Sequence, residues 1–149
     1  MKLTSHPLIR DELVAKLKEG EDIESIEKAI NEQQAEAIMY NDRIVGCVKR
    51  AHDVDVNLSA HVMFENLVSK ASASLAAIHL LDKNNIAPEE IDYVLECSEE
   101  ACGDMNQRGG GNFAKSIAEI ANLVNATGAD LRGFCAAPTH TIINAASLV

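Results

Sequence analysis

The sequence has no tryptophan, and it has only two tyrosines and three phenylalanines among its 149 residues. Proteins that bind single-stranded nucleic acids stack the bases on aromatic side chains, and this chain has little material for such a platform. Basic residues are also scarce, because 13 Lys and Arg stand against 23 Asp and Glu, for a formal net charge of −10 at pH 7. That charge repels phosphate backbones and anionic lipid surfaces, so we expect neither nucleic acid nor membrane as a partner.

Long apolar runs are missing as well. No run approaches the roughly 18 residues that a membrane-spanning helix needs, and no apolar signal segment follows Lys2. We therefore expect a cytoplasmic protein. The cysteines could form two disulfides by number alone, but a cytoplasmic chain of this size does not need them, so we expect thiols at Cys47, Cys97, Cys102 and Cys135.

Two amphipathic helices are predicted at the N-terminus. Residues 8–19 place apolar side chains at helical spacing, and Gly20 follows where a C-terminal cap belongs. A second helix starts after Asp22, a typical N-cap residue, and carries isoleucines on one face. We expect residues 1–34 to form a helical appendage and residues 35–149 to form the main domain.

Strands and helices alternate in the main domain, which predicts a layered α/β architecture. Asn41 and Asp42 supply a tight turn between the first two strands, and Gly128 is expected to end the last helix but one. The small residues at 71–77 predict a close approach of another backbone. The predicted order is strand 35–40, strand 44–50, helix 59–82, strand 91–97, helix 112–125, strand 130–134 and helix 136–149.

The last predicted helix is unusual because no Asp, Glu, Lys or Arg occurs after Arg132. A helix that is apolar or weakly polar on all faces is typically buried on all sides. We therefore expect further layers to pack on it, and we expect the chain to be part of a larger protein.

Cys135 is the candidate nucleophile. It lies between a predicted strand and a predicted helix, where unsatisfied N–H groups and the positive end of the helix dipole favour a thiolate. A packed structural thiol is the alternative, although Ala136 and Ala137 leave space for a substrate arm. His140 falls about 140° around the helix from Cys135, so we expect a core histidine bonded to the backbone rather than a base for the thiol.

A glycine-rich loop precedes the helix predicted over residues 112–125. Its N–H groups and its arginine could hold an anion, although the loop lacks the Lys and Ser/Thr that end a phosphate-binding P-loop. Because parallel strands gather their following loops at one edge, we expect this loop at the mouth of the Cys135 site. The candidate anion-binding residues are Arg108, Gly109, Gly110 and Gly111.

Metal or redox chemistry at Cys97 and Cys102 is a further alternative. Four residues separate the two cysteines, and a second ligand pair is missing, so the pattern does not match the usual zinc or redox spacings. We expect no metal and no cofactor. We expect His52 and His61 to be packing or surface residues.

Over nearly its whole length the chain resembles a known family. The segments ECSEEACGDMNQRGGGNFAKSIAEIA and GADLRGFCAAPTHTIINAASLV, with the upstream VGCVKRAHDVD and LSAHVMFENLVSKAS, are similar to the beta subunit of component C of the glycine/sarcosine/betaine reductase complex. The resemblance runs from about His6 to Val149, and its most specific part lies between Cys97 and Phe113.

This resemblance implies a fold and a chemistry. The family is similar to ketoacyl-ACP synthase III and thiolases, in which a buried helix starts at the acyl-accepting cysteine, here Cys135. The implied fold is α/β, the first half of a thiolase-like layered fold with a mixed sheet. The implied reaction is acyl transfer, in which a carboxymethyl group is received from a selenoether and an acetyl thioester on Cys135 is cleaved by phosphate to acetyl phosphate.

The resemblance also implies partners. They are the alpha subunit of component C, the selenoprotein component and inorganic phosphate, and an exposed strand edge at 130–134 predicts a homo-oligomer. Family subunits are several times longer, so the His and Asn that complete the site are expected outside this chain. The alternative function is a non-catalytic assembly or binding module, or an inactive fragment, of the same complex.

Overall fold

The computed structural model describes residues 11–98 and 113–149. The chain divides into two compact units, an N-terminal unit of Met1–Val68 and a C-terminal unit of Ser69–Val149. The division falls within the long helix α3 (Ala60–Asn84). The appendage over residues 1–34 stays a prediction.

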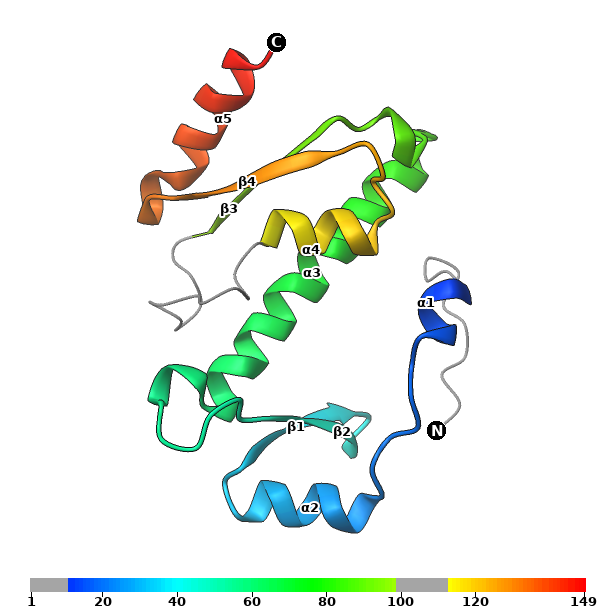
Figure 1. Ribbon diagram of the computed structural model, residues 1–149, viewed down its shortest axis with the longest axis vertical. Helices are drawn as coiled ribbons and strands as arrows, with labels where there is room; N and C mark the ends of the chain where they lie inside the picture. The colour runs from blue at the N-terminus through cyan, green and yellow to red at the C-terminus, as the bar shows by residue number, and fades with distance from the viewer. Residues whose placement is uncertain (1–10, 99–112) are drawn as a thin grey trace. The chain divides into compact units, whose positions relative to one another are not determined.

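In the N-terminal unit, a helix packs on a two-stranded hairpin (Figure 1). Helix α2 (Ile23–Asn31) contacts β1 (Ala35–Tyr40) and β2 (Arg43–Lys49), which pair in antiparallel fashion. The predicted N-cap is confirmed, because the carboxylate of Asp22 accepts the backbone N–H of Ser25 at 2.8 Å.

The turn of this hairpin is also confirmed. Tyr40 pairs with Arg43, which leaves Asn41 and Asp42 as the connecting residues. Both lie in the left-handed region, with φ of 48° and 59°, as in the two-residue turns that suit the twist of a hairpin.

The first predicted helix is much shorter than expected. Helix α1 spans only Asp11–Ala15, rather than residues 8–19, and the part before residue 11 lies outside the described residues. Leu17, which should have continued the apolar stripe, is exposed. Gly20 is therefore not the cap of this helix.

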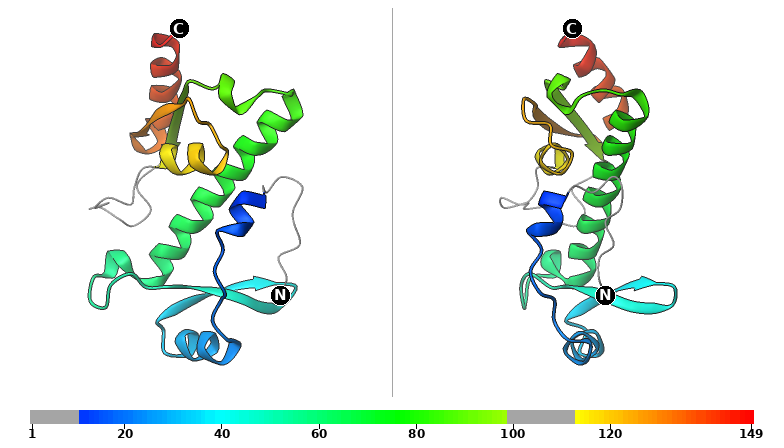
Figure 2. Two further views of the ribbon diagram at one scale, coloured as in Figure 1. Left: turned by 45° about the vertical axis from the view of Figure 1, so that its right-hand side comes forward. Right: turned by 90° about the vertical axis from the view of Figure 1, so that its right-hand side faces the viewer.

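The C-terminal unit has helices on both faces of a parallel strand pair (Figures 1 and 2). Strands β3 (Tyr93–Ser98) and β4 (Thr127–Arg132) are hydrogen-bonded neighbours. Helix α4 (Phe113–Ile120) packs against one face, and α5 (Ala137–Ser147) packs against the other. The core of this unit centres on Phe113, whose side chain is fully buried between α4 and the sheet.

The α/β class is confirmed, but the single mixed sheet is not formed among the described residues. The antiparallel pair of β1 and β2 and the parallel pair of β3 and β4 belong to two separate sheets. The thiolase-like arrangement of a larger sheet stays a prediction.

The helix predicted over residues 112–125 is interrupted early. Helix α4 ends at Ile120 because Asn122 takes a left-handed conformation, with φ of 60°. Gly128 was wrongly predicted to end this helix, since it lies inside β4. A Cβ atom there would lie 2.4 Å from the carbonyl oxygen of Val94, so only glycine lets the two strands approach this closely.

Helix α3 confirms the prediction over residues 59–82. It ends where Asn85 adopts a φ of 52°, and a single 3₁₀ turn follows at Pro88–Glu90. Within the small-residue segment 71–77, only the side of Ser74 is buried. Other small side chains of the segment are exposed, namely those of Ala71, Ser72 and Ala76, and the close approach of another backbone stays a prediction.

The last helix is covered on one side only. Ala137 in the first turn is fully buried, but the side chains of Ile142 and Ile143 are 70% and 60% exposed. Burial on all sides is therefore not achieved by the described residues, because a sheet of two strands covers only one face of α5. The further layers that the sequence predicts over this helix stay a prediction.

Candidate active site around Cys135

Cys135 lies at the junction that the sequence predicted. Strand β4 ends at Arg132, a single 3₁₀ turn spans Phe134–Ala136, and α5 starts at Ala137. The backbone N–H of Ala136 donates to the carbonyl of Gly133 at 3.0 Å, which closes this turn. The thiol of Cys135 is exposed, so a substrate can reach it.

The turn that carries Cys135 contains a strained residue. Phe134 has a φ of 49°, a conformation that bulky side chains rarely adopt because Cβ crowds the backbone. Its ring is 66% exposed, so burial of the ring does little to offset this cost. Strain of this kind persists only where the flanking structure holds it, and it is common at functional sites.

His140 lies close to the same turn but is not a core residue. Its side chain is exposed, which corrects the expected buried histidine. A Cβ atom on Gly133 would lie 3.5 Å from the ring atom Cδ2 of His140, so the imidazole lies beside the backbone that precedes Cys135. The helical angle of about 140° does not describe this pair, because Cys135 precedes α5 in a separate 3₁₀ turn.

A part-buried charge cluster lies at the carboxyl ends of β3 and β4. Arg132 donates from Nη1 to Oε2 of Glu96 at 2.7 Å and from Nη2 to Oδ2 of Asp130 at 3.4 Å. The side chains of Glu96, Asp130 and Arg132 are 11%, 14% and 28% exposed. We call Glu96, Asp130 and Arg132 the strand-end cluster.

Asp130 connects this cluster to α4. Its two carboxylate oxygens accept the backbone N–H groups of Phe113 and Ala114, each at 2.8 Å. These are two of the N–H groups that the start of a helix leaves without partners in the helix. Asp130 therefore acts as the N-cap of α4 from a distant position in the chain.

Two cations lie near the ring of Phe113. Nζ of Lys70 lies 5.1 Å from the ring centroid, and the guanidinium carbon of Arg132 lies 5.4 Å from it. Both distances are within the range of cation–π attraction. The ring thus joins α3, α4 and β4 within the C-terminal unit.

The strand-end cluster is not among the site residues predicted from the sequence. The available signal was three charged residues near the ends of two predicted strands that were expected to run in parallel. The register of the parallel pair places Glu96 opposite Asp130. Arg132 lies two positions after Asp130 and therefore on the same face of the sheet. That register could be determined only from the paired strands.

The predicted anion-binding loop is only partly tested. Its flanking strands β3 and β4 are parallel neighbours, as expected. The residues themselves lie outside the described part of the chain, so their roles stay predictions: Arg108, Gly109, Gly110 and Gly111.

Two of the other cysteines lie in strands. Cys47 in β2 and Cys97 in β3 are half-buried thiols, and Cys102 lies outside the described residues.

Nδ1 of His52 accepts the backbone N–H groups of Val54 and Asp55. The ring nitrogens of His61 lie within 4 Å of carboxylates, at 3.8 Å from Glu36 and 3.4 Å from Glu65. Across residues 11–98 and 113–149, no three His, Cys, Asp or Glu side chains converge as a metal site would require.

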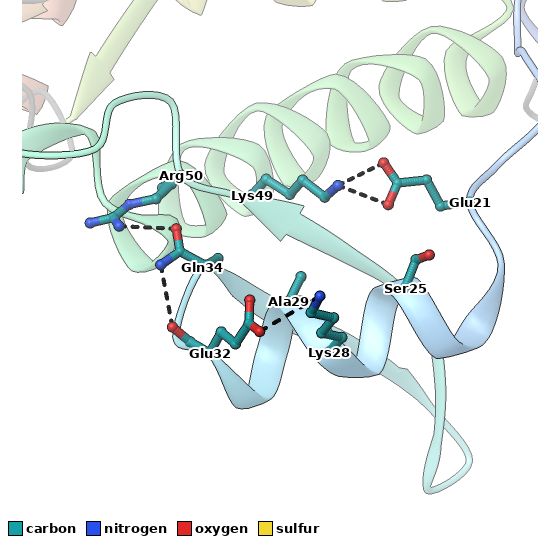
Figure 3. A pocket seen from close by; sticks show the side chains of 8 residues that line it. All are labelled: Glu21, Ser25, Lys28, Ala29, Glu32, Gln34, Lys49 and Arg50. Carbon is teal, nitrogen blue, oxygen red and sulfur yellow. Dashed lines mark hydrogen bonds and ion pairs between the residues drawn. The ribbon is translucent and has the colours of Figure 1, made fainter.

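A polar surface pocket of about 490 Å³ lies in the N-terminal unit (Figure 3). It lies between α2 and the end of β2. Its charged side chains largely satisfy one another, since Lys49 binds both carboxylate oxygens of Glu21, at 2.6 and 2.8 Å, and Arg50 donates to Gln34. The hydrogen bond to Glu21 raises the pKa of Lys49 above its ordinary 10.5. None of the predicted site residues lines this pocket, so the candidate site remains at Cys135.

Among the described helices, none is both long enough and apolar enough to cross a bilayer.

Comparison with known proteins confirms the resemblance. The chain is 58% identical over 148 residues to glycine/sarcosine/betaine reductase complex component C subunit beta of Peptoclostridium acidaminophilum. The match covers 99% of this chain but 29% of that subunit, so the chain spans less than a third of the relative's length. No family model matches the chain, and no solved structure is significantly similar to it.

Proposed function

We propose that this chain carries the acyl-accepting cysteine of a component C beta subunit and that Cys135 forms an acetyl thioester. The observation that carries the proposal is an exposed thiol in a strained turn directly before an 11-residue helix. The N–H groups at the start of such a helix stabilise negative charge, which favours a nucleophilic thiolate. The similarity to a component C beta subunit supports the choice of reaction.

The proposed reaction has two steps at the same sulfur atom. Sγ of Cys135 attacks the carbonyl carbon of an acyl donor, and the donor's leaving group departs as the S–C bond forms. An oxygen of inorganic phosphate then attacks the thioester carbonyl. The S–C bond breaks, acetyl phosphate leaves and the Cys135 thiolate is regenerated.

The proposal includes a fold and partners. The described strands and helices would belong to the first half of a thiolase-like layered fold, with the general base supplied from outside this chain. The partners would be the alpha subunit of component C, the selenoprotein component of the reductase complex and further copies of the chain itself. Arg108 and the glycines that follow it would bind the phosphate.

The test is a phosphate-dependent release assay. The protein, within an assembled component C, is incubated with a small acetyl thioester and inorganic phosphate, and acetyl phosphate is trapped as a hydroxamate. We expect product from the wild type and from Cys47→Ala, a matched change of a half-buried thiol in β2. Product formation by Cys135→Ala at the wild-type rate would contradict the proposal.

A second candidate function is a non-catalytic assembly module, and the exposed apolar side of α5 favours it. Ile142 and Ile143 present branched aliphatic side chains to solvent, which is typical of surfaces that bind another protein. Under this alternative, no variant of the chain would release acetyl phosphate, whereas Ile143→Glu would weaken assembly of the complex.

A further inference from the structure

The strained turn before Cys135 needs support on both sides. A bulky residue with a φ of 49° would adopt an ordinary backbone conformation unless the residues on either side of it were held in place. Phe134 contributes little packing of its own, because its ring is largely exposed. The shape of the turn must therefore be determined by the elements that precede and follow it.

The helix side of the turn is held by close packing. Ala137 at the start of α5 is fully buried. A Cβ atom on Gly133 would lie 3.4 Å from the backbone nitrogen of Ala137, so the backbones on the two sides of Cys135 lie close together. Backbone packing therefore holds the helix side of the turn in place.

The strand side of the turn carries an ion pair between Arg132 and Glu96. The pairing of β4 with β3 ends at Arg132 opposite Ser98, and the 3₁₀ turn begins two residues later, at Phe134. At this last position Arg132 reaches back to Glu96 with a hydrogen bond of 2.7 Å. The side chains of Glu96 and Arg132 are 11% and 28% exposed, so solvent screens this ion pair less than a surface pair.

We infer that Arg132 and Glu96 are positioning residues for Cys135, and that their ion pair fixes the end of β4 so that the strained turn presents the thiol to the N–H groups of α5. This inference rests on the proposed role of Cys135 as a nucleophile. Arg132 lies three residues before the thiol and acts through the backbone. Loss of the ion pair would let the turn relax, and Cys135 would then react more slowly although it remains exposed.

The test measures the rate of alkylation of each cysteine by iodoacetamide at neutral pH, using peptide mass spectrometry on the full chain. Cys47, in the other unit, is the internal reference. We expect Arg132→Met to slow Cys135 about tenfold and Arg132→Lys to restore most of the rate, since small misplacements at a reacting atom have effects of this order. Cys47 should be unaffected.

Two further variants separate positioning from folding. Glu96→Gln keeps the size and one acceptor of the carboxylate but removes its charge, so it should slow Cys135 about threefold and decides the question if Arg132→Met does not fold. Lys49→Met removes the exposed ion pair with Glu21 and should leave Cys135 unchanged. Circular dichroism shows which variants are folded.

The outcomes distinguish a failure of the positioning role from a failure of the proposed function. If wild-type Cys135 reacts no faster than Cys47, the proposed function itself fails. If wild-type Cys135 reacts fast and keeps that rate in folded Arg132→Met or folded Glu96→Gln, the positioning role is overturned and the proposed function stands.

Discussion

The carboxylate of Asp130 in β4 accepts the backbone N–H of Phe113, 17 residues earlier in the chain, at 2.8 Å. A cap supplied by a distant strand fixes where α4 begins, because it satisfies N–H groups that the helix cannot satisfy itself. The same carboxylate lies beside Arg132, so the start of α4 and the strand that leads to Cys135 share one anchor.

Replacing this cap should therefore destabilise the C-terminal unit. We expect Asp130→Ala to lower the free energy of unfolding by about 2 kcal/mol, because two N–H groups lose a charged acceptor in a part-buried position. Urea denaturation followed by circular dichroism measures the change. The control is Asp53→Ala, at an exposed aspartate between β2 and α3, which should change this free energy by less than about 0.5 kcal/mol. Equal effects of the two substitutions would contradict the capping role.

Gly128 should be intolerant of any side chain. A Cβ atom would lie 2.4 Å from the carbonyl oxygen of Val94 and 3.1 Å from Cβ of Ala114, so backbone would have to move. We expect Gly128→Ala to cost about 1–3 kcal/mol of stability, as over-packing does elsewhere. The matched control is Gly46→Ala in β2, where the nearest atom is the flexible Ile38 side chain at 3.7 Å. A Gly128→Ala protein with wild-type stability would show that the strands can separate freely.

The start of α2 should be sensitive to acid. The hydrogen bonds from the backbone N–H and the hydroxyl of Ser25 hold the pKa of Asp22 below its ordinary 3.8. Because the folded state then binds the proton less tightly than the unfolded state, this contribution to stability is present above pH 3.8 and is lost as the pH falls through the lowered pKa.

The amide chemical shift of Ser25, followed by NMR during acidification, reports this loss. Asp22→Asn is the matched control, since asparagine also caps helices but does not titrate. Its Ser25 amide should show no transition in the same pH range. A transition of equal size in both proteins would mean that Asp22 is not its source.

The strain at Phe134 can be measured by comparing two truncations. Phe134→Ala and Phe134→Gly both remove the ring, but only glycine adopts a φ of 49° without steric cost. We expect the glycine variant to be more stable than the alanine variant by about 1 kcal/mol in urea denaturation. At an unstrained position the order is reversed, so an alanine variant of higher stability would rule out strain at this turn.

Local signals explain why much of the fold could be predicted from the sequence. Asp22 marks the start of α2, and Asn41 with Asp42 marks the hairpin turn, because a few adjacent residues determine these features. The strand, Cys135 and the following helix were recognised for the same reason. The alternation of strands and helices gave the α/β class.

The predictions that failed depended on contacts between distant residues. Gly128 has the sequence signature of a helix end, but a glycine is required there because the carbonyl of Val94 on the neighbouring strand leaves no room for a side chain. The link between Glu96 and Arg132 spans 36 residues and requires the register of β3 and β4. The prediction of further layers over α5 stays a prediction, because the two described strands cover only one face of this helix.

The most direct test of the central claim is the location of the acetyl group after the protein meets an acetyl thioester donor without phosphate. Peptide mass spectrometry of the trapped protein identifies the modified residue. The account predicts one acetyl group, on Cys135, and its loss when phosphate is added. Acetylation that spreads equally over Cys47, Cys97 and Cys135, or that stays on Cys135 after phosphate is added, would contradict the account.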